Sequence, residues 1–86
     1  MTSENHGIAR TAAEAVARGY AKSTRTPPAE AKGSGWIHIA HLGATEGDIC
    51  YIGPCNEGST TRPVCYFDDQ GSCTNCYDEE DHACGG

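Results

Sequence analysis

The chain lacks the large apolar side chains from which most protein cores are built. Only 9 of its 86 residues are Leu, Ile, Val or Phe, well below the ~20% under which a chain starts to look unable to fold. A chain of this length forms one small domain at most, and its net charge is too modest to force complete disorder. The composition therefore excludes a large enzyme with a deep pocket, and it predicts a small fold that needs support beyond its core.

Long apolar runs are missing as well. No run of ~18 apolar residues is present that would span a membrane, and no apolar stretch follows a basic N-terminus as in a standard secretory signal. Six Lys and Arg against twelve Asp and Glu give a formal net charge of -6, which argues against a nucleic-acid partner. Because the G-x-S-x-G, H-E-x-x-H and phosphate-loop motifs are absent, we expect the protein not to be an enzyme.

Charge and cysteine divide the chain into two unlike halves. Residues 1–44 contain five basic and three acidic residues, whereas residues 45–86 contain one basic and nine acidic residues together with all six cysteines. Such asymmetry indicates segments with different roles. We predict a leader-like or partner-docking helical segment over residues 1–22, a Pro-, Gly- and Ser-rich linker over 23–35, and an acidic cysteine-rich segment over 36–86.

The helical prediction for the N-terminal segment rests on spacing. Apolar side chains recur every fourth residue from Ile8 through Val16 to Tyr20, which is the period of one helix face. Glu14 precedes Arg18 in the order that favours an i,i+4 ion pair. Two interpretations remain open at this point: a frayed, solvated helix, or a helix that docks on modifying or export machinery.

Particular residue types also indicate where this helix starts and ends and where the linker follows. We expect Ser3 or Asn5 to cap the start of the helix and Gly19 to weaken its last turn. The following stretch over residues 23–35 has a Pro pair, a Gly-Ser-Gly run and no large apolar side chain, as is typical of a linker.

Short β-like runs begin at residue 36. Residues 36–42, 49–52 and 64–67 are apolar or aromatic, with a hairpin loop expected at 43–47 and Gly-Pro and Arg-Pro pairs breaking up the rest. After residue 67 there is almost no apolar content. We therefore predict a small cysteine-rich, loop- and β-rich C-terminal segment of short antiparallel hairpins. Crosslinks or a metal would staple it, and a short N-terminal helix and a flexible linker would precede it.

Trp36 and two histidines lie in the first of these runs. We expect Trp36 to anchor the core. His38 and His41 would point to opposite faces of a strand, so we expect them to be half-buried or surface side chains that do not bind one metal together.

The cysteines form an internal repeat. Three of the four tyrosines follow a cysteine directly, and a second cysteine closes each unit. The units have the form Cys-Tyr-x(n)-Cys over residues 50–55, 65–73 and 76–84, with n of 3, 6 and 6. Each tyrosine would point to the strand face opposite its cysteine and pack against crosslinks of neighbouring units. The repeat predicts three local loops, each closed by a crosslink or a metal.

Disulfides are the first chemistry that would close these loops. An even number of cysteines in a small segment is typical of a disulfide framework. Because cytosolic thiols stay reduced, disulfides would imply secretion by a non-standard route, with a cytoplasmic location as the alternative. The repeat favours local pairing, as Cys50–Cys55, Cys65–Cys73 and Cys76–Cys84.

Metal is the second chemistry. The C-x2-C spacing at residues 73–76 is that of a zinc knuckle, and it would make the chain an intracellular interaction module that binds zinc or an iron–sulfur cluster. Cys65 would be left over. The acids that would bind calcium lack the EF-hand spacing; they are Asp68, Asp69, Asp78, Glu79, Glu80 and Asp81. The zinc or iron–sulfur ligands would be Cys50, Cys55, Cys73, Cys76, His82 and Cys84.

Enzymatic crosslinking of a precursor peptide is the third chemistry. The order of a cysteine-free helical segment, a linker and a cysteine-dense segment resembles ribosomally made, post-translationally modified peptides, in architecture only. That resemblance implies a leader, with a cleavage site near Gly43-Ala44, and thioether rings between Cys65 and Thr61 and between Cys76 and Ser72. We expect a non-enzymatic peptide that is exported or modified, bacteriocin-like or signalling, with the metal-binding module as the alternative.

Overall fold

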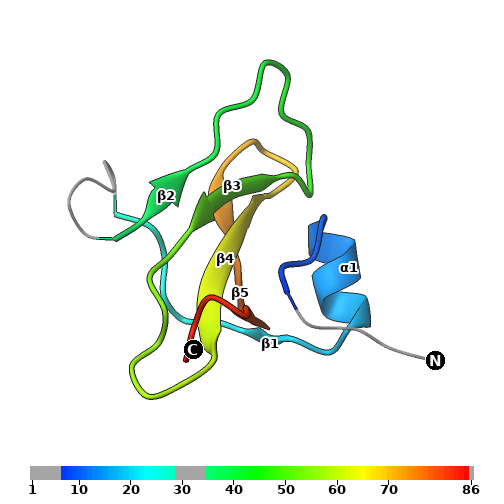
Figure 1. The fold of residues 1–86 in the computed structure, drawn as a ribbon. Coiled ribbons are helices and arrows are strands. Elements are labelled where there is room, and N and C mark those ends of the chain that lie inside the picture. The colour runs from blue at the N-terminus through cyan, green and yellow to red at the C-terminus, as the bar shows by residue number, and fades with distance from the viewer. Residues whose placement is uncertain (1–6, 29–34, 86) are drawn as a thin grey trace.

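The computed structural model describes residues 7–28 and 35–85. Within them a five-stranded antiparallel sheet carries one short helix, so the predicted small β-rich, cysteine-rich fold is confirmed. The strands lie in the order β1-β5-β4-β3-β2 (Figure 1). The elements in chain order are α1 (Ala12–Ala17), β1 (Ala21–Lys22), β2 (Ile37–His38), β3 (Ile49–Ile52), β4 (Thr61–Phe67) and β5 (Cys73–Glu80).

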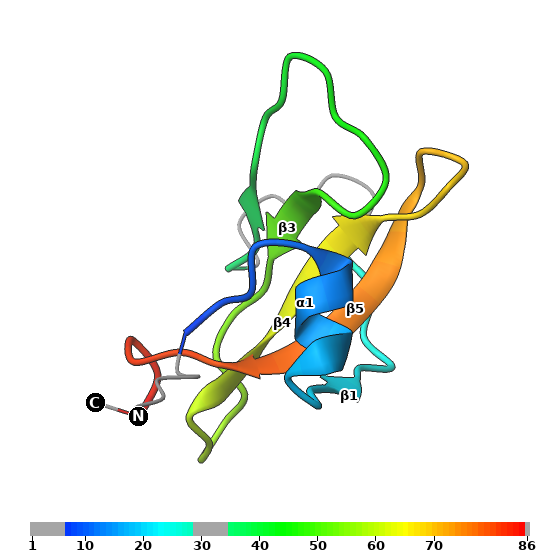
Figure 2. The same cartoon turned by 90° about the vertical axis from the view of Figure 1, so that its right-hand side faces the viewer.

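Strand β4 lies at the centre of the sheet, and its residues 63–66 are all buried. Because successive side chains of a strand point to opposite faces, Val64 and Tyr66 lie on one face and Cys65 on the other. Helix α1 covers the first face, with β4 and β5 behind it in Figure 2. Cys50, Cys65 and Cys76 cluster on the second face. Trp36 packs against this cluster, as we expected for a side chain that anchors the core. The protein therefore has two thin cores, one on each side of the sheet.

Helix α1 begins at a capping pattern that our sequence analysis overlooked. The Thr11 hydroxyl accepts a hydrogen bond from the Glu14 backbone N–H at 3.1 Å, and the Glu14 carboxylate accepts one from the Arg10 N–H at 3.0 Å. A Thr followed three residues later by Glu is the sequence signature of a capping box. Thr11 is the N-cap of this helix, whereas Ser3 and Asn5 lie outside the described residues.

Gly19 ends the helix, whereas we expected it only to weaken the last turn. Its φ of 85° lies in the left-handed region that glycine adopts without a steric penalty. The Gly19 N–H donates to the Val16 carbonyl and the Tyr20 N–H to the Ala15 carbonyl, at 3.0 and 3.1 Å, which is the Schellman arrangement. The helix is consequently only six residues long.

The buried side of α1 differs from the apolar series that the spacing predicts. Ala9 and Ala15 are fully buried, but the Val16 side chain is 59% exposed. Ile8 and Tyr20 do pack against this core, from positions outside the helix. Alanine side chains are small, so they let the helix backbone lie close to the strands.

The segment after the helix joins the sheet directly. Strand β1 pairs with β5, with Ala21 opposite Asp78 and Lys22 opposite Tyr77. Ser23, at the start of the predicted linker, is buried and donates its backbone N–H to the Cys76 carbonyl at 2.7 Å. Residues 29–34 of that linker lie outside the described part of the chain.

Strands β2 and β3 form the predicted antiparallel pair, but the first is shorter than expected. Ile37 lies opposite Ile52 and His38 opposite Tyr51. The connection over residues 39–48 projects from the sheet in both views (Figures 1 and 2). Its base is fixed by the His41 side chain, whose ring nitrogen Nε2 donates to the Ile49 carbonyl at 2.6 Å.

Two features of the C-terminal half correct the sequence analysis. Arg62 and Pro63, which we assigned to a break between strands, lie within β4. Pro63 is tolerated there because β3 ends at Ile52, and beyond that end the Pro63 carbonyl accepts the Gly53 N–H. Strand β5, the longest in the described chain, has few apolar side chains and gave no hydrophobic signal from which we could place it.

A pair of neighbouring substitutions tests the observed face of α1. Ala15→Glu would bury a carboxylate against the sheet and should lower the free energy of unfolding by at least ~2 kcal/mol. Val16→Glu, one residue away on the exposed side, should change it by less than ~0.5 kcal/mol. Urea unfolding of the disulfide-bonded protein measures both. A larger effect of Val16→Glu would contradict the packing described here.

Candidate functional site

Three disulfides link the cysteine-rich half of the chain. They join Cys50 to Cys73, Cys55 to Cys84 and Cys65 to Cys76, with Cα–Cα distances of 6.2, 5.6 and 3.9 Å. All six cysteines lie in the described residues, and none of them is free. Two disulfides connect strands, β3 to β5 and β4 to β5, whereas the third connects the loop after β3 to the tail after β5.

The local pairing that the repeat predicts is wrong. Cys50 and Cys55 are five residues apart along an extended stretch, where the chain advances ~3.3 Å per residue. A disulfide needs Cα atoms within ~7 Å. Antiparallel pairing brings distant residues together instead, and the β4–β5 register places Cys65 directly opposite Cys76. The disulfides therefore follow the strands and not the repeat units.

The disulfides also remove the sulfur atoms on which the other two chemistries depend. A thiolate ligand or a thioether needs a cysteine sulfur that is not in a disulfide. No such sulfur is left for the predicted zinc ligands or for the predicted thioether rings. Within residues 7–28 and 35–85, no group of three or more His, Cys, Asp or Glu side chains is placed to bind a metal. The predicted acidic ligands have other contacts, such as Asp81 with Arg62 and Glu80 with Thr60.

The three Cys-Tyr pairs share a common place in the fold. Each pair lies on one of the three central strands, β3, β4 or β5. The predicted alternation is confirmed in two pairs, because Tyr66 and Tyr77 lie in the core under α1, away from the cysteine side. Tyr51 packs on the cysteine side, because a bulge leaves Cys50 without an opposite residue between Ile49 and Tyr51.

A buried carboxyl group lies under the helix. Glu79, one of the acids named above as a calcium ligand, is fully buried. Its Oε1 accepts the backbone N–H of Ala9 at 2.7 Å, and its Oε2 forms a short hydrogen bond with the Tyr66 hydroxyl. The same hydroxyl lies 3.2 Å from the Ala9 carbonyl oxygen. Three groups from β5, β4 and the N-terminal segment thus form a closed polar network.

The protonated form of Glu79 satisfies this network completely. A neutral carboxyl donates its proton to the Tyr66 oxygen, which leaves the Tyr66 proton for the Ala9 carbonyl, while the Ala9 N–H still donates to the carboxyl. Burial raises the pKa of Glu79 above its usual range, although Tyr66, Ala9 and Arg18 act in the opposite direction. Burial and the Glu79 carboxyl also raise the pKa of Tyr66. No signal that we used in the sequence separated this acid from its three acidic neighbours.

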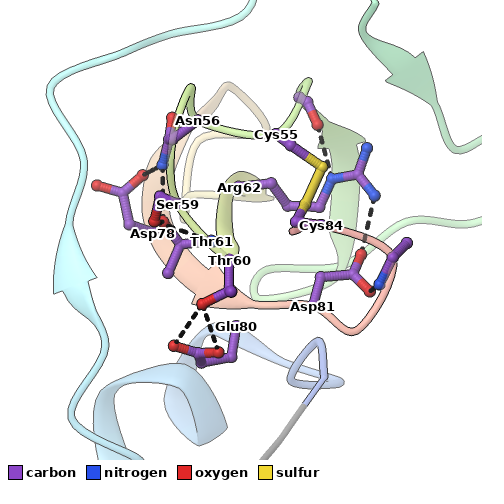
Figure 3. The surroundings of a disulfide bond; sticks show 12 residues. Cys55, Asn56, Ser59, Thr60, Thr61, Arg62, Asp78, Glu80, Asp81 and Cys84 are labelled. Carbon is purple, nitrogen blue, oxygen red and sulfur yellow. Dashed lines mark hydrogen bonds and ion pairs between the residues drawn. A yellow bond between two sulfur atoms is a disulfide. The ribbon is translucent and has the colours of Figure 1, made fainter. Parts of the chain in front are cut away.

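The Cys55–Cys84 disulfide lies at the surface beside a network of polar contacts (Figure 3). Arg62 donates to the Gly53 carbonyl and forms an ion pair with Asp81 at 2.8 Å, and this pairing holds the pKa of Asp81 below its usual range. A hollow of about 700 Å³ lies next to the disulfide. Its lining residues are Cys55, Asn56, Glu57, Gly58, Ser59, Thr60 and Gly85.

The β2 end of the molecule carries an aromatic and apolar surface. Tyr51 contacts Trp36 edge-to-face and stacks at a tilt on His38, with ring centroids 6.5 and 4.9 Å apart, and Arg25 lies over the Trp36 ring. On the projecting loop, Leu42 is fully exposed. As expected, His38 and His41 are exposed and do not converge: His38 contacts Tyr51, whereas His41 contacts Phe67.

Taken together, these features define a small, disulfide-crosslinked, cysteine-rich protein. The sequence matches no protein-family model, no curated protein and no solved structure. In the part of the chain that is described, no helix has the length and apolar character needed to cross a bilayer.

The Glu79 network generates a prediction about pH. A carboxyl whose pKa is raised on folding adds stability that is fully present below its unfolded pKa and is lost as pH rises through its folded pKa. Glu79→Gln keeps the shape and the donor pattern of the neutral carboxyl but does not titrate. We expect this variant to lose less stability than the parent between pH 4.5 and pH 8, as measured by urea unfolding at each pH.

A second substitution at Glu79 measures what its hydrogen bonds contribute, apart from its charge. Glu79→Ala leaves the Tyr66 hydroxyl and the Ala9 N–H without their buried partner, so it should cost ~2–4 kcal/mol at the acidic end of this range and less as pH rises. Parallel pH profiles for the parent and Glu79→Gln would contradict the raised pKa of Glu79.

Proposed function

We propose that this chain is an exported, non-enzymatic protein that acts by binding a protein partner, as a bacteriocin-like or signalling protein. The observation that carries the proposal is the use of all six cysteines in disulfides. Such disulfides persist in oxidising compartments and are rare in the cytosol. Small exported proteins use them because their cores are too small to stabilise the fold alone.

The β2 end is the best-supported contact surface. The large apolar side chains that are most exposed in the described chain are Val16, Ile37 and Leu42, and two of these three lie on β2 and its loop. The arginine-aromatic cluster of Arg25, Trp36 and Tyr51 at this end has the residue types that are enriched in protein-binding surfaces. The disulfide from Cys50 to Cys73 fixes β3, from which this loop emerges.

Within this proposal, residues 7–23 act mainly in folding. Ala9 and Ala15 cover the sheet, and strand β1 adds hydrogen bonds to β5. A leader that was cut off after folding would expose Tyr66, Tyr77 and the buried Glu79. Docking of residues 1–22 on modifying or export machinery would therefore take place before the chain folds.

The export proposal is tested by the mass and location of the natural material. We expect the protein outside the cytoplasm of its host, with an intact mass lowered by the hydrogens lost in three disulfides and restored by reductant. Peptide mapping without reductant should recover the three pairs found here. Cytoplasmic material with six free thiols would contradict the proposal.

The binding surface is tested by a matched pair of variants. Leu42→Ser should weaken partner binding or biological activity at least ~10-fold, because burying a Leu side chain is worth ~1.5–3 kcal/mol, and it should leave the unfolding midpoint unchanged. Val16→Ser changes an exposed side chain on the opposite part of the fold and should leave activity intact. Growth inhibition and receptor-response assays distinguish the bacteriocin-like from the signalling form. Equal activity of Leu42→Ser and the parent would contradict this surface.

A further inference from the structure

We propose that the Cys55–Cys84 disulfide is a thiol-exchange site, at which a low-molecular-weight thiol forms a mixed disulfide with Cys55 while the other two disulfides stay intact. This inference concerns covalent modification of the folded protein. It is independent of the partner that the β2 end binds, so failure of either proposal leaves the other standing.

Accessibility distinguishes this disulfide from the other two. Of the four cysteines in the two strand-to-strand disulfides, Cys50, Cys65 and Cys76 have at most 1% of their surface exposed, and Cys73 is half-buried. Cys55 is exposed, whereas its partner Cys84 is only 3% exposed. Thiol–disulfide exchange requires the attacking sulfur to reach a disulfide sulfur. Cys55 is therefore the sulfur that an external thiol meets first.

The hollow beside the disulfide provides room for the attacking molecule. Its volume of about 700 Å³ is within the range of small-molecule sites, ~300–1,000 Å³. Cys55 itself lines the hollow, and so does Gly85 from the tail. A small thiol can approach Cys55 from this side without displacing a strand.

The exchange needs no reactant other than the incoming thiol. The thiolate of the incoming molecule attacks the Cys55 sulfur, the bond to the Cys84 sulfur breaks, and Cys84 leaves as a thiolate that takes up the proton the incoming thiol released. The products are a mixed disulfide on Cys55 and a free thiol on Cys84. A second molecule of the same thiol can then reduce the mixed disulfide, with formation of the small-molecule disulfide.

The surrounding contacts allow this bond to open locally. The loop retains the Asn56 N–H to Thr61 carbonyl bond at 2.8 Å and the Asn56 side-chain bond to Asp78 at 3.1 Å. The tail retains the Arg62–Asp81 ion pair and the Asp81 N–H to Thr60 carbonyl bond. Cys55 and Cys84 both lie outside the strands, so the sheet does not depend on their bond.

The test is a time course with 2-mercaptoethanol on the folded, fully oxidised chain. Samples are quenched with acid, free thiols are alkylated, and peptic peptides are analysed by mass spectrometry. We expect the mixed disulfide on Cys55 and alkylation on Cys84 to appear first, at least ~10-fold faster than any opening of the other two disulfides. Near-ultraviolet circular dichroism should stay unchanged during this first phase.

Three comparisons complete the experiment. In concentrated urea the three disulfides should react at similar rates, because the fold no longer protects two of them. The variant Cys55→Ser/Cys84→Ser should lose the fast phase, whereas Cys50→Ser/Cys73→Ser should keep it. If a variant does not fold, peptide mapping of the thiol-treated parent protein still tests the proposal. Opening of either strand-to-strand disulfide as fast as Cys55–Cys84, or a mixed disulfide on Cys84, would overturn the proposal.

Discussion

The antiparallel register between β4 and β5 determines where almost every other part of this protein lies. It runs from Thr61 opposite Glu80 to Phe67 opposite Cys73. This register places Cys65 against Cys76 on one face and Val64 against Tyr77 on the other. A slip by one residue would exchange the faces of one strand. Glu79 would then leave the Tyr66 hydroxyl, and the disulfide between the two strands would no longer form.

The scarcity of large apolar side chains explains why this register is reinforced covalently. Each core is only one layer of side chains thick, with alanines under the helix and cysteines on the other face. In the chain-entropy model, disulfides closing loops of these lengths stabilise the fold by about 3–4 kcal/mol each. That is a large share of the ~5–15 kcal/mol by which folded proteins are stable. The crosslinks thus replace the hydrophobic burial that the composition cannot supply.

The buried Glu79 network has a related role on the helix side. A helix of six residues is too short to be stable alone in water. Its position depends on contacts with the sheet, and the Ala9 backbone is joined to both Glu79 and Tyr66. Because an unpaired carboxyl is costly to bury, this network specifies one docking position for the N-terminal segment.

Several elements were predictable because their signals are local. Glu14 and Arg18 pair along one helix face, the runs around Ile49–Ile52 and Val64 form strands, and two of the three Cys-Tyr pairs alternate between faces. Thr11 and Glu14 also carried a local signal, the capping box, which we overlooked. Strand β5 could not be predicted in this way, because its polar side chains gain their environment only from β4 and β1 on either side.

The amino-acid sequence by itself determined the class of this protein: a small core, six cysteines confined to the acidic half, and a short helix ahead of a β-rich segment. Composition and short-range spacing suffice for these properties, because they depend on which side chains are present and on neighbours a few residues apart. Tertiary structure alone decided which cysteines pair, which acid is buried and which disulfide is exposed. Those outcomes depend on the pairing of strands, and that pairing joins residues as far apart in sequence as Ala21 and Asp78.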